Sequence, residues 1–313
     1  NDLRTKGYEL VLGWRDSFKL AGKQFSYGIS ASLSDYTAKY TKCDNPSGLI
    51  GDPYVGKKYG EIWGYKVDGL FRNDEEAAEY ASRVDLSKVA AGYYSATGAY
   101  GKGVRGGDIK YLDLDGSGIV DGGKGTLEDP GDRRVIGNSS PRYQYGLTLN
   151  LSWYGFDLSV FMQGIGRLDW YPGADNLRFW GPYSRPYATF IPKNFMSQVW
   201  SESNPDAYLP RARAYTSLNS TQGTAYYTND RYLQNLAYCR LKNLTIGYTI
   251  PRRLTSKVGI KECRIYFSGE NLATWSALES DFLDPEQAAA DSDKKSNVYP
   301  WCKTYSVGLN LTF

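Results

Sequence analysis

The chain has 313 residues, with 28 Tyr, 8 Trp and 34 Gly but no His, and its formal net charge is +3. A charge this small, spread along the chain, argues against nucleic-acid binding through a basic surface, and the lack of His removes the commonest zinc ligand and general base. The 4 Cys lie far apart and form no Cys-x-x-Cys pair, so neither a zinc site nor a disulfide framework is indicated.

Two stretches near the start of the chain alternate between apolar and polar residues. This period of two is typical of a strand with one apolar and one polar face. The stretches are 8–18 and 24–36, and the polar face of the second is almost pure Ser and Gly. Few strands of soluble sandwiches sustain such alternation over the length needed to cross a bilayer. The segment 37–141 that follows has no clean strand pair, and the run DEEAAEYASRV within it predicts a helix.

Five further segments show the same alternation. Segments 142–153 and 156–163 predict the clearest hairpin, and 237–250 and 262–274 predict a second one. The last strand is 304–313, TYSVGLNLTF. Its apolar residues are expected to face lipid: Tyr305, Val307, Leu309, Leu311 and Phe313. The small and polar residues between them are expected to face a lumen: Ser306, Gly308, Asn310 and Thr312.

The connections between these strands alternate in length. Short turns lie within the hairpins, and long loops occupy 37–141, 169–236 and 275–302. Outer-membrane barrels have this sidedness, with short periplasmic turns and long extracellular loops. Bacterial single-chain barrels use even strand numbers, whereas seven strands leave one sheet edge unpaired, which lipid does not tolerate. The predicted fold is therefore all-β, a transmembrane antiparallel β-barrel to which residues 1–313 contribute the C-terminal strands.

Several motifs recur in an order that resembles the SusC/RagA-type TonB-linked outer-membrane transporters of Bacteroidetes, over nearly the whole chain. They are GEIWGYKVDGLF, GDIKYLDLDGSGIVD, DRRVIGNSSPRYQYGLTLNLSWYGFDLSVFMQG, YCRLKNLTIGYTIP, RIYFSGENLATWS and TYSVGLNLTF. The resemblance implies a barrel of about 22 strands in the bacterial outer membrane, with a plug inside. It also implies an N-terminal barrel half, contact with TonB through a missing N-terminal part, and a SusD-like surface lipoprotein as partner. Homodimers of such transporter–lipoprotein pairs are a further implication.

The motif DLDGSGIVD has the spacing of an EF-hand-type calcium loop. Its candidate ligands are Asp113, Asp115, Ser117, the Ile119 carbonyl and Asp121. Position twelve is Lys124, so the bidentate Glu is missing. In the family the acidic turn runs on quickly into an Asp-Arg pair, whereas here GGKGTLEDPG precedes Asp132-Arg133, which weakens the case for Asp132 as a ligand. The alternative is an Asp/Gly turn held by its own hydrogen bonds.

The second long loop carries DWYPGADNLRFWGPYSRPY, whose aromatic rings and charges are candidate cargo contacts. The candidates are Trp170, Trp180, Tyr183 and Arg185. The alternative is that these side chains pack the loops together or meet the lipoprotein.

Two functions of different classes remain open from the sequence. The first is active import of oligosaccharides or peptides through a plugged barrel. The second is a passive pore, or a structural or adhesive surface barrel. A soluble secreted β protein with a calcium loop is a third alternative, whereas no catalytic set is recognisable and we expect no enzyme activity.

Overall fold

Seven long strands form one antiparallel sheet in the computed structural model, which describes residues 1–94, 103–184, 187, 191–213, 218, 223–290 and 301–313. Their order is β1-β2-β7-β8-β11-β12-β13, so each strand pairs with its neighbours in sequence among the long strands. The strands are β1 (Asp2–Leu20), β2 (Lys23–Lys42), β7 (Arg142–Trp153), β8 (Phe156–Arg167), β11 (Tyr238–Thr249), β12 (Glu262–Ser276) and β13 (Thr304–Thr312). All seven predicted strands are confirmed.

The register of the sheet separates an apolar face from a polar one. One row of paired residues is apolar across six strands: Tyr27, Leu151, Leu158, Ile246, Phe267 and Val307. The adjacent row on the other face is polar or small across all seven: Arg15, Gly28, Asn150, Ser159, Thr245, Ser268 and Ser306. Because side chains alternate along each strand, this register places apolar residues on one face of the sheet and polar or small residues on the other.

No layer formed by the described residues covers the apolar face of the sheet. In β13, Tyr305, Val307 and Leu309 are 63%, 79% and 57% exposed. In β1, Leu12 and Trp14 are 61% and 63% exposed. An apolar surface of this extent is far larger than a soluble monomer presents, and contact with lipid accounts for it.

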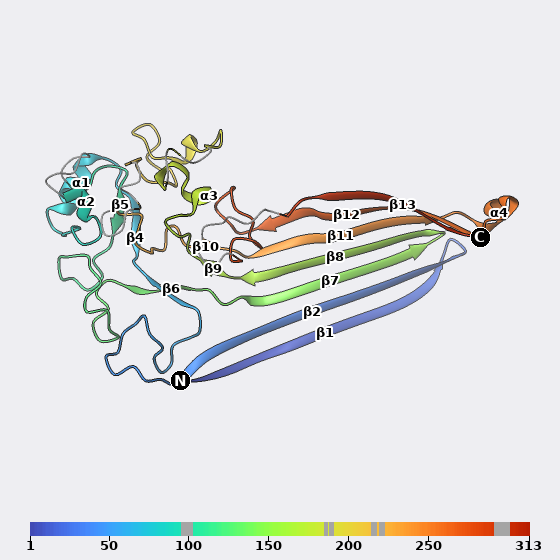
Figure 1. Cartoon of the computed structure of the whole chain (residues 1–313), viewed down its shortest axis with the longest axis horizontal. Coiled ribbons are helices and arrows are strands. Elements are labelled where there is room, and N and C mark those ends of the chain that lie inside the picture. Colours follow the sequence, from blue (N-terminus) through green and yellow to red (C-terminus); the bar gives the residue numbers. More distant parts are fainter. Residues whose placement is uncertain (95–102, 185–186, 188–190, 214–217, 219–222, 291–300) are drawn as a thin grey trace.

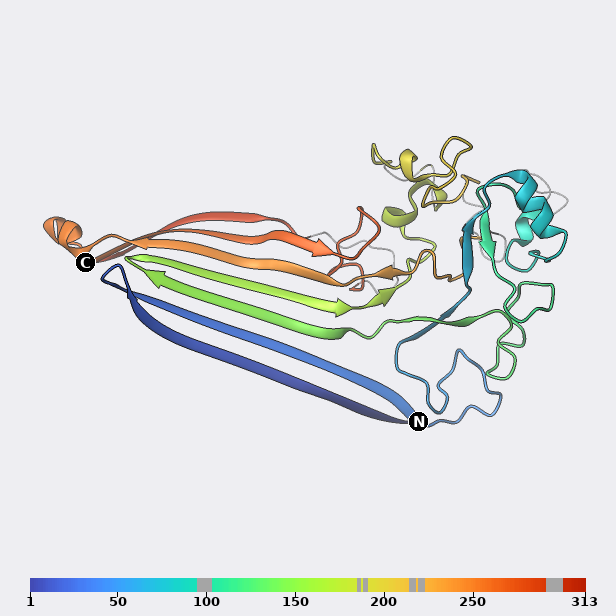
Figure 2. The same ribbon diagram turned by 180° about the vertical axis from the view of Figure 1, so that it is seen from behind.

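The sheet is open, because β1 and β13 are its two edges and do not pair with each other in the described part of the chain. Figures 1 and 2 show the strands running lengthwise, with the connecting segments gathered at one end and α4 at the other. Asn1 lies at the end of the connecting segments, and the chain terminus at Phe313 lies at the opposite end (Figure 1). The short turns and long loops therefore fall on opposite ends of the sheet, as their lengths predicted.

The segments 43–141 and 168–237, here called the loop layer, hold most of the short elements. They contain three two-stranded sheets, which the sequence pattern did not predict. The strands are β3 (Glu61–Gly64), β4 (Val67–Leu70), β5 (Ile109–Tyr111), β6 (Arg134–Asn138), β9 (Asp169–Trp170) and β10 (Gln234–Asn235).

Helices are few and short. They are α1 (Asp74–Ala81), α2 (Ala91–Tyr94), α3 (Leu177–Trp180) and α4 (Arg252–Thr255), with 3-10 turns η1 (Gly181–Tyr183), η2 (Met196–Gln198) and η4 (Ser256–Val258). Helix α1 confirms the predicted helix, and Asn73 caps it by accepting a hydrogen bond from the Glu76 N–H at 2.9 Å. Within the described residues, no helix has both the length and the apolar character needed to cross a membrane.

Candidate functional site

The loop layer is a folded unit with its own hydrophobic core, to which both of its segments contribute. Tyr65, Phe71 and Tyr111 from the first segment pack in one cluster with Trp180 and Tyr232 from the second. The Tyr111 hydroxyl donates to the Thr224 carbonyl at 2.5 Å, and the Tyr65 N–H donates to the Thr228 carbonyl at 2.9 Å. Two loops that are separate in sequence therefore share one interior.

A buried ion pair joins the same two segments. Arg213 donates to Asp108 through Nε at 2.9 Å and through a terminal nitrogen at 2.5 Å. The two residues are 3% and 1% exposed, and the guanidinium stacks on the Tyr93 ring at 4.2 Å. Burial raises the pKa of the Asp108 carboxyl, against the effect of Arg213. Because each charge relies on the other, this pair ties the loops strongly together.

The acidic loop lies at the edge of the loop layer and is completed by a residue outside the motif. Carboxylate oxygens of Asp113, Asp115 and Asp132 lie within 4.8 Å of one another. Asp132 is fully buried and accepts from the backbone N–H groups of Leu114, at 2.6 Å, and Asp121, at 2.9 Å. Burial raises the pKa of the Asp132 carboxyl, whereas these backbone bonds favour its charged form. The residues inserted before Asp132 form a separate loop, so Asp132 still lies next to the acidic motif.

The structure brings together only part of the predicted calcium ligand set. Asp113 accepts from the N–H groups of Gly116 and Gly118, and its carboxylate lies beside that of Asp115. The hydroxyl of Ser117 donates to the Ile119 carbonyl at 3.0 Å, so these two candidates bond to each other. The carboxylate of Asp121 turns away and accepts from the Gly123 N–H at 2.7 Å. Both the cation site and the self-bonded turn remain compatible with this geometry.

Calcium binding by this loop stays a prediction with a direct test. We expect titration calorimetry on the full-length protein to give a saturable calcium signal that Asp115→Asn weakens, because this carboxylate is exposed and belongs to the cluster. Glu79→Gln, on the exposed face of α1, serves as the charge-matched control. Absence of heat at millimolar calcium would leave the loop as an Asp/Gly turn.

The aromatic candidates of the second loop lie inside the loop layer. Trp170, Trp180 and Tyr183 are 5%, 0% and 2% exposed, and the Tyr183 hydroxyl donates to the Pro210 carbonyl at 2.5 Å. Arg185 lies outside the described residues. These three rings could contact cargo directly only if the loop layer opened, so a cargo role for them stays a prediction. In the structure they pack inside the layer.

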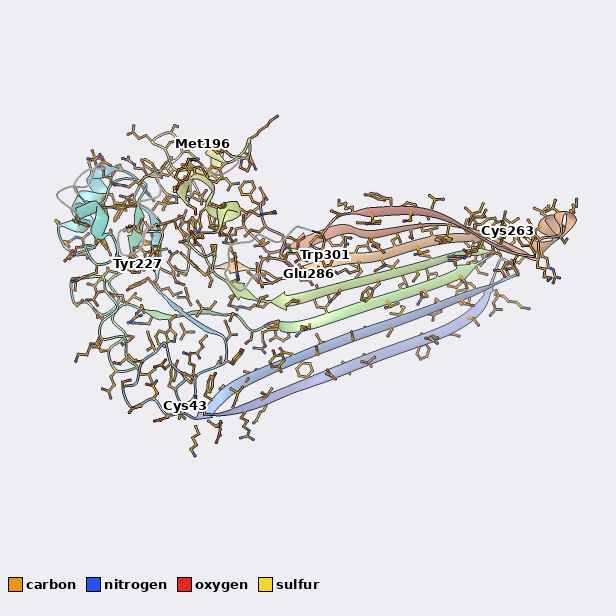
Figure 3. The ribbon with its side chains drawn as sticks, in the orientation of Figure 1. Cys43, Met196, Tyr227, Cys263, Glu286 and Trp301 are labelled. Carbon is orange, nitrogen blue, oxygen red and sulfur yellow. The ribbon has the colours of Figure 1, made fainter. Side chains whose placement is uncertain are left out.

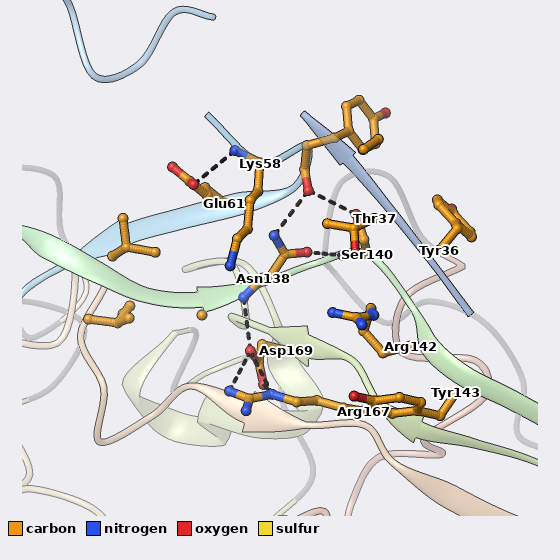
Figure 4. Close-up of a pocket in the computed structure, with 15 residues that line it drawn as sticks. Tyr36, Thr37, Lys58, Glu61, Asn138, Ser140, Arg142, Tyr143, Arg167 and Asp169 are labelled. Carbon is orange, nitrogen blue, oxygen red and sulfur yellow. Dashed lines mark hydrogen bonds and ion pairs between the residues drawn. The ribbon is translucent and has the colours of Figure 1, made fainter. Parts of the chain in front are cut away.

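A polar pocket of about 400 Å³ lies where β2, β7 and β8 enter the loop layer, and we call it the mouth pocket (Figure 4). The Arg142 guanidinium makes two 2.6 Å bonds to Asp35, and Arg167 bonds to Asp169 at 3.1–3.3 Å. The Lys58 ammonium has no hydrogen-bond or ion-pair partner in the part of the chain that is described. The rings of three lining tyrosines are partly exposed: Tyr36, Tyr59 and Tyr143.

The mouth pocket combines free donors with aromatic surface. Its carboxylates are occupied, since Asp169 also accepts from the Asn138 N–H at 2.8 Å and Glu61 accepts from the Lys58 N–H at 2.9 Å. Rings offer stacking faces to sugars or to peptide side chains, and free donors hold hydroxyl, carbonyl or carboxylate oxygens. The sequence motifs did not single out this pocket, because its lining comes from four separate stretches of the chain: 36–38, 58–61, 135–143 and 167–169.

No protein-family model matches the chain. It is 25% identical over 334 aligned positions to TonB-dependent receptor P3 of Formosa agariphila, covering 100% of this chain and 29% of the receptor. It is 28% identical to receptor P26 of the same organism over 66% of this chain, and 21% identical to SusC of Bacteroides thetaiotaomicron over 61%. The RagAB peptide transporter superposes with a TM-score of 0.60 over 99% of this chain and 29% of that chain, at 18% identity.

Along its whole length the chain is similar to TonB-dependent receptors, and it shares its fold with the RagAB peptide transporter. The resemblance seen in the ordered motifs is confirmed by receptors that match along the whole chain. The chain spans less than a third of the length of these relatives. They are receptors and transporters rather than enzymes, which confirms the prediction of a non-enzymatic role.

In a receptor of this type, the polar face of the sheet lines the barrel lumen. A glycine shapes part of this face, because Arg264 crosses β11 above Gly247 to bond Asp157. A Cβ at Gly247 would lie 2.5 Å from both charged groups, so a side chain there would displace the pair. The lumen wall therefore carries a fixed ion pair among small polar residues.

A second charged cluster fastens the segment 277–290 to the lumen side of the sheet. Arg240 is 1% exposed and donates to Thr274 at 2.9 Å, to Asp284 at 2.7 Å and to Glu286 at 2.7 Å. Lys242 donates to the same Glu286 at 2.7 Å. Figure 3 places Glu286 and Trp301 together at the loop ends of the last strands. The segment 277–290 is thus bonded to the polar face of the sheet at its loop end.

Proposed function

We propose that the complete receptor imports nutrient molecules, oligosaccharides or peptides, across the outer membrane with energy supplied through TonB. The observation that carries the proposal is the two-faced sheet with a folded loop layer at one end only. The apolar face suits lipid, the polar face suits a water-filled or plugged lumen, and the loop layer suits capture of cargo outside the cell. Likeness to TonB-dependent receptors and to the RagAB peptide transporter supports this assignment.

The partners of the receptor form part of the same proposal. The exposed edges of β1 and β13 fit further strands of the barrel, because unpaired backbone groups are not tolerated in lipid. A plug inside the barrel and a TonB-contacting segment belong to the remainder of the receptor. A SusD-like lipoprotein would cover the loop layer, and two such pairs would form the homodimer that the family resemblance implies.

The ordered loops at one end of the sheet favour active import over a passive pore. The loop layer has a core and a buried ion pair between its segments, and the segment 277–290 is bonded to the lumen side through Arg240. A passive pore works best with an open lumen, whereas a gated importer needs ordered loops that hold cargo. The following test distinguishes active import from a passive pore and from an adhesive barrel.

The test is uptake by cells that lack the gene and carry it back on a plasmid, on a panel of labelled glycans and peptides. We expect one cargo class to be lost on deletion, to be restored by the wild-type gene, and to require a functional TonB. A Lys58→Ala, Tyr59→Ala double change in the mouth pocket should raise the half-saturating cargo concentration by roughly threefold to tenfold, since it removes one charged donor and one ring.

The controls separate import from the alternatives. Lys193→Ala removes an exposed lysine of the loop layer that does not line the mouth pocket, and its uptake should equal that of wild type. Uptake that continues at the same rate without TonB would identify a passive pore. Unchanged uptake of every cargo after deletion would leave a structural or adhesive role.

A further inference from the structure

The ten residues inserted before Asp132 fold into a closed loop rather than a loose extension. The loop 122–131 closes at its base through a bond from the Asp132 N–H to the Asp121 carbonyl at 3.0 Å. Its outer part is held by the 45–50 segment, where the Ile50 N–H donates to Gly125 at 2.9 Å. The loop is therefore a defined part of the surface, and its first residues form the glycine-rich turn Gly122-Gly123-Lys124-Gly125.

This turn is shaped to lie against the guanidinium of Arg133. A Cβ at Gly122 would lie 3.0 Å from three guanidinium atoms, and one at Gly125 would lie 2.9 Å from a terminal nitrogen. Gly123 and Gly125 also have φ of 52° and 73°, the left-handed region that favours glycine. Glycines at these positions let the flat guanidinium approach the backbone closely.

The turn and Arg133 form one wall of a second pocket, of about 330 Å³, which we call the glycine pocket. None of its lining side chains is a carboxylate, although Asp121 and Asp129 bond or contact the same turn at Gly123. Figure 3 marks its position in the loop layer by Tyr227. The lining residues are Trp63, Gly64, Tyr65, Gly122, Gly123, Lys124, Gly125, Arg133, Tyr227 and Thr228.

Two cationic side chains at the glycine pocket, Arg133 and Lys124, carry donors that meet no acceptor among the described residues, whereas the Tyr227 hydroxyl donates to the Lys88 carbonyl at 2.9 Å. The Arg133 guanidinium donates once, to the Gly122 carbonyl at 2.7 Å, and its Nε–H is buried without a partner among the described residues. The exposed Lys124 ammonium has no partner in the described part of the chain. A buried donor without an acceptor destabilises the fold, so a ligand that supplies acceptors relieves that cost.

We propose that the glycine pocket binds one oxyanion group, a carboxylate, sulfate or phosphate. A guanidinium beside an ammonium and a glycine-rich turn is the arrangement that proteins use for such groups, because the guanidinium fork matches two oxygens at once. The oxyanion gives Arg133 its missing acceptor after a small shift of the side chain and neutralises Lys124. It belongs either to a solute outside the cell or to an acidic side chain of a protein on the loop layer. The site does not depend on the import proposal.

Binding of inorganic sulfate to the purified full-length receptor tests this site. Calorimetric titrations with sodium sulfate, at ionic strength held constant with sodium chloride, should give saturable binding to wild type and to Lys193→Ala. Lys124→Ala should weaken sulfate binding by about tenfold or more, because it removes a charged donor and keeps the three glycines of the turn. Lys124 is exposed and makes no bond in the described structure, so this variant keeps the fold.

Two results would overturn the proposal: no sulfate binding to wild type, or equal sulfate binding to wild type and Lys124→Ala. Competition then identifies the source of the oxyanion. Displacement of sulfate by glucuronate points to an acidic solute, whereas displacement only by a glutamate-containing peptide points to a protein side chain. Uptake of cargo is measured separately, so loss of the anion site and loss of import remain distinguishable.

Discussion

Asp108→Ala is expected to unfold the loop layer while the seven-stranded sheet stays intact. The change leaves Arg213, 3% exposed, without its bidentate carboxylate in the interior of the layer. Removing one member of a buried ion pair costs about 3–5 kcal/mol. The pair joins segments 43–141 and 168–237, so both should loosen together. The sheet has its own hydrogen bonds and should not respond.

Limited proteolysis of whole cells measures this effect, because a protease outside the cell reaches only exposed loops. Cleavage that follows the open population should accelerate by about 100-fold or more for a cost of this size. Glu79→Ala is the matched control, since it breaks an exposed pair with Arg83 that contributes little. Protection equal to wild type in Asp108→Ala would mean that Tyr93 and its neighbours hold the loops without the pair.

Arg240→Ala is expected to release the segment 277–290 from the mouth of the barrel. Arg240 is the common donor to Thr274, Asp284 and Glu286, and its removal leaves two carboxylates beside the sheet with Lys242 alone. A cost of about 3–5 kcal/mol is expected for breaking this partly buried network. Hydrogen exchange of the detergent-solubilised receptor should show the segment losing protection, with the strands unchanged.

A rescue variant distinguishes stranded charge from lost packing in this cluster. Arg240→Met combined with Asp284→Asn and Glu286→Gln removes the charges of Arg240 and its two carboxylates and retains most of the volume, while Lys242 keeps an amide oxygen at position 286 as its acceptor, so protection of 277–290 should return in large part. Arg240→Met alone should behave like Arg240→Ala. If the triple variant exchanges as fast as the single one, the hydrogen bonds and not the stranded carboxylates hold the segment.

The long strands could be predicted from the sequence because their two faces meet different surroundings. Every second residue of TYSVGLNLTF lies on the exposed apolar face, and the same rule holds in the other six strands. The short strands of the loop layer carry no such signal. Strand β5, for example, has three residues, Ile109–Tyr111, and buries two of them inside an irregular core. An alternating pattern can be recognised only in a long strand, whereas the positions of these short strands depend on tertiary contacts.

The candidate sites were harder to predict because their parts are distant in sequence. Asp132 joins the acidic loop although an insertion separates it, since the insertion folds away as a closed loop. The two carboxylate acceptors of Arg240 lie 44 and 46 residues further along the chain. Composition also does not separate a buried ring from an exposed one, and Trp180 lies fully inside the layer. Motif spacing predicted the local turns but not these partners.

The shared interior of the loop layer limits how the receptor can diversify. Two loops that each pack on the other cannot vary independently, because a larger side chain in one must be matched in its neighbour. If a single loop were exchanged between related receptors, the core residues of the new loop would meet those of a loop against which they had not packed before. A change of cargo preference should therefore require segments 43–141 and 168–237 to change together. Alternatively, it could arise at pocket-lining positions outside the core, such as Lys58 and Lys124.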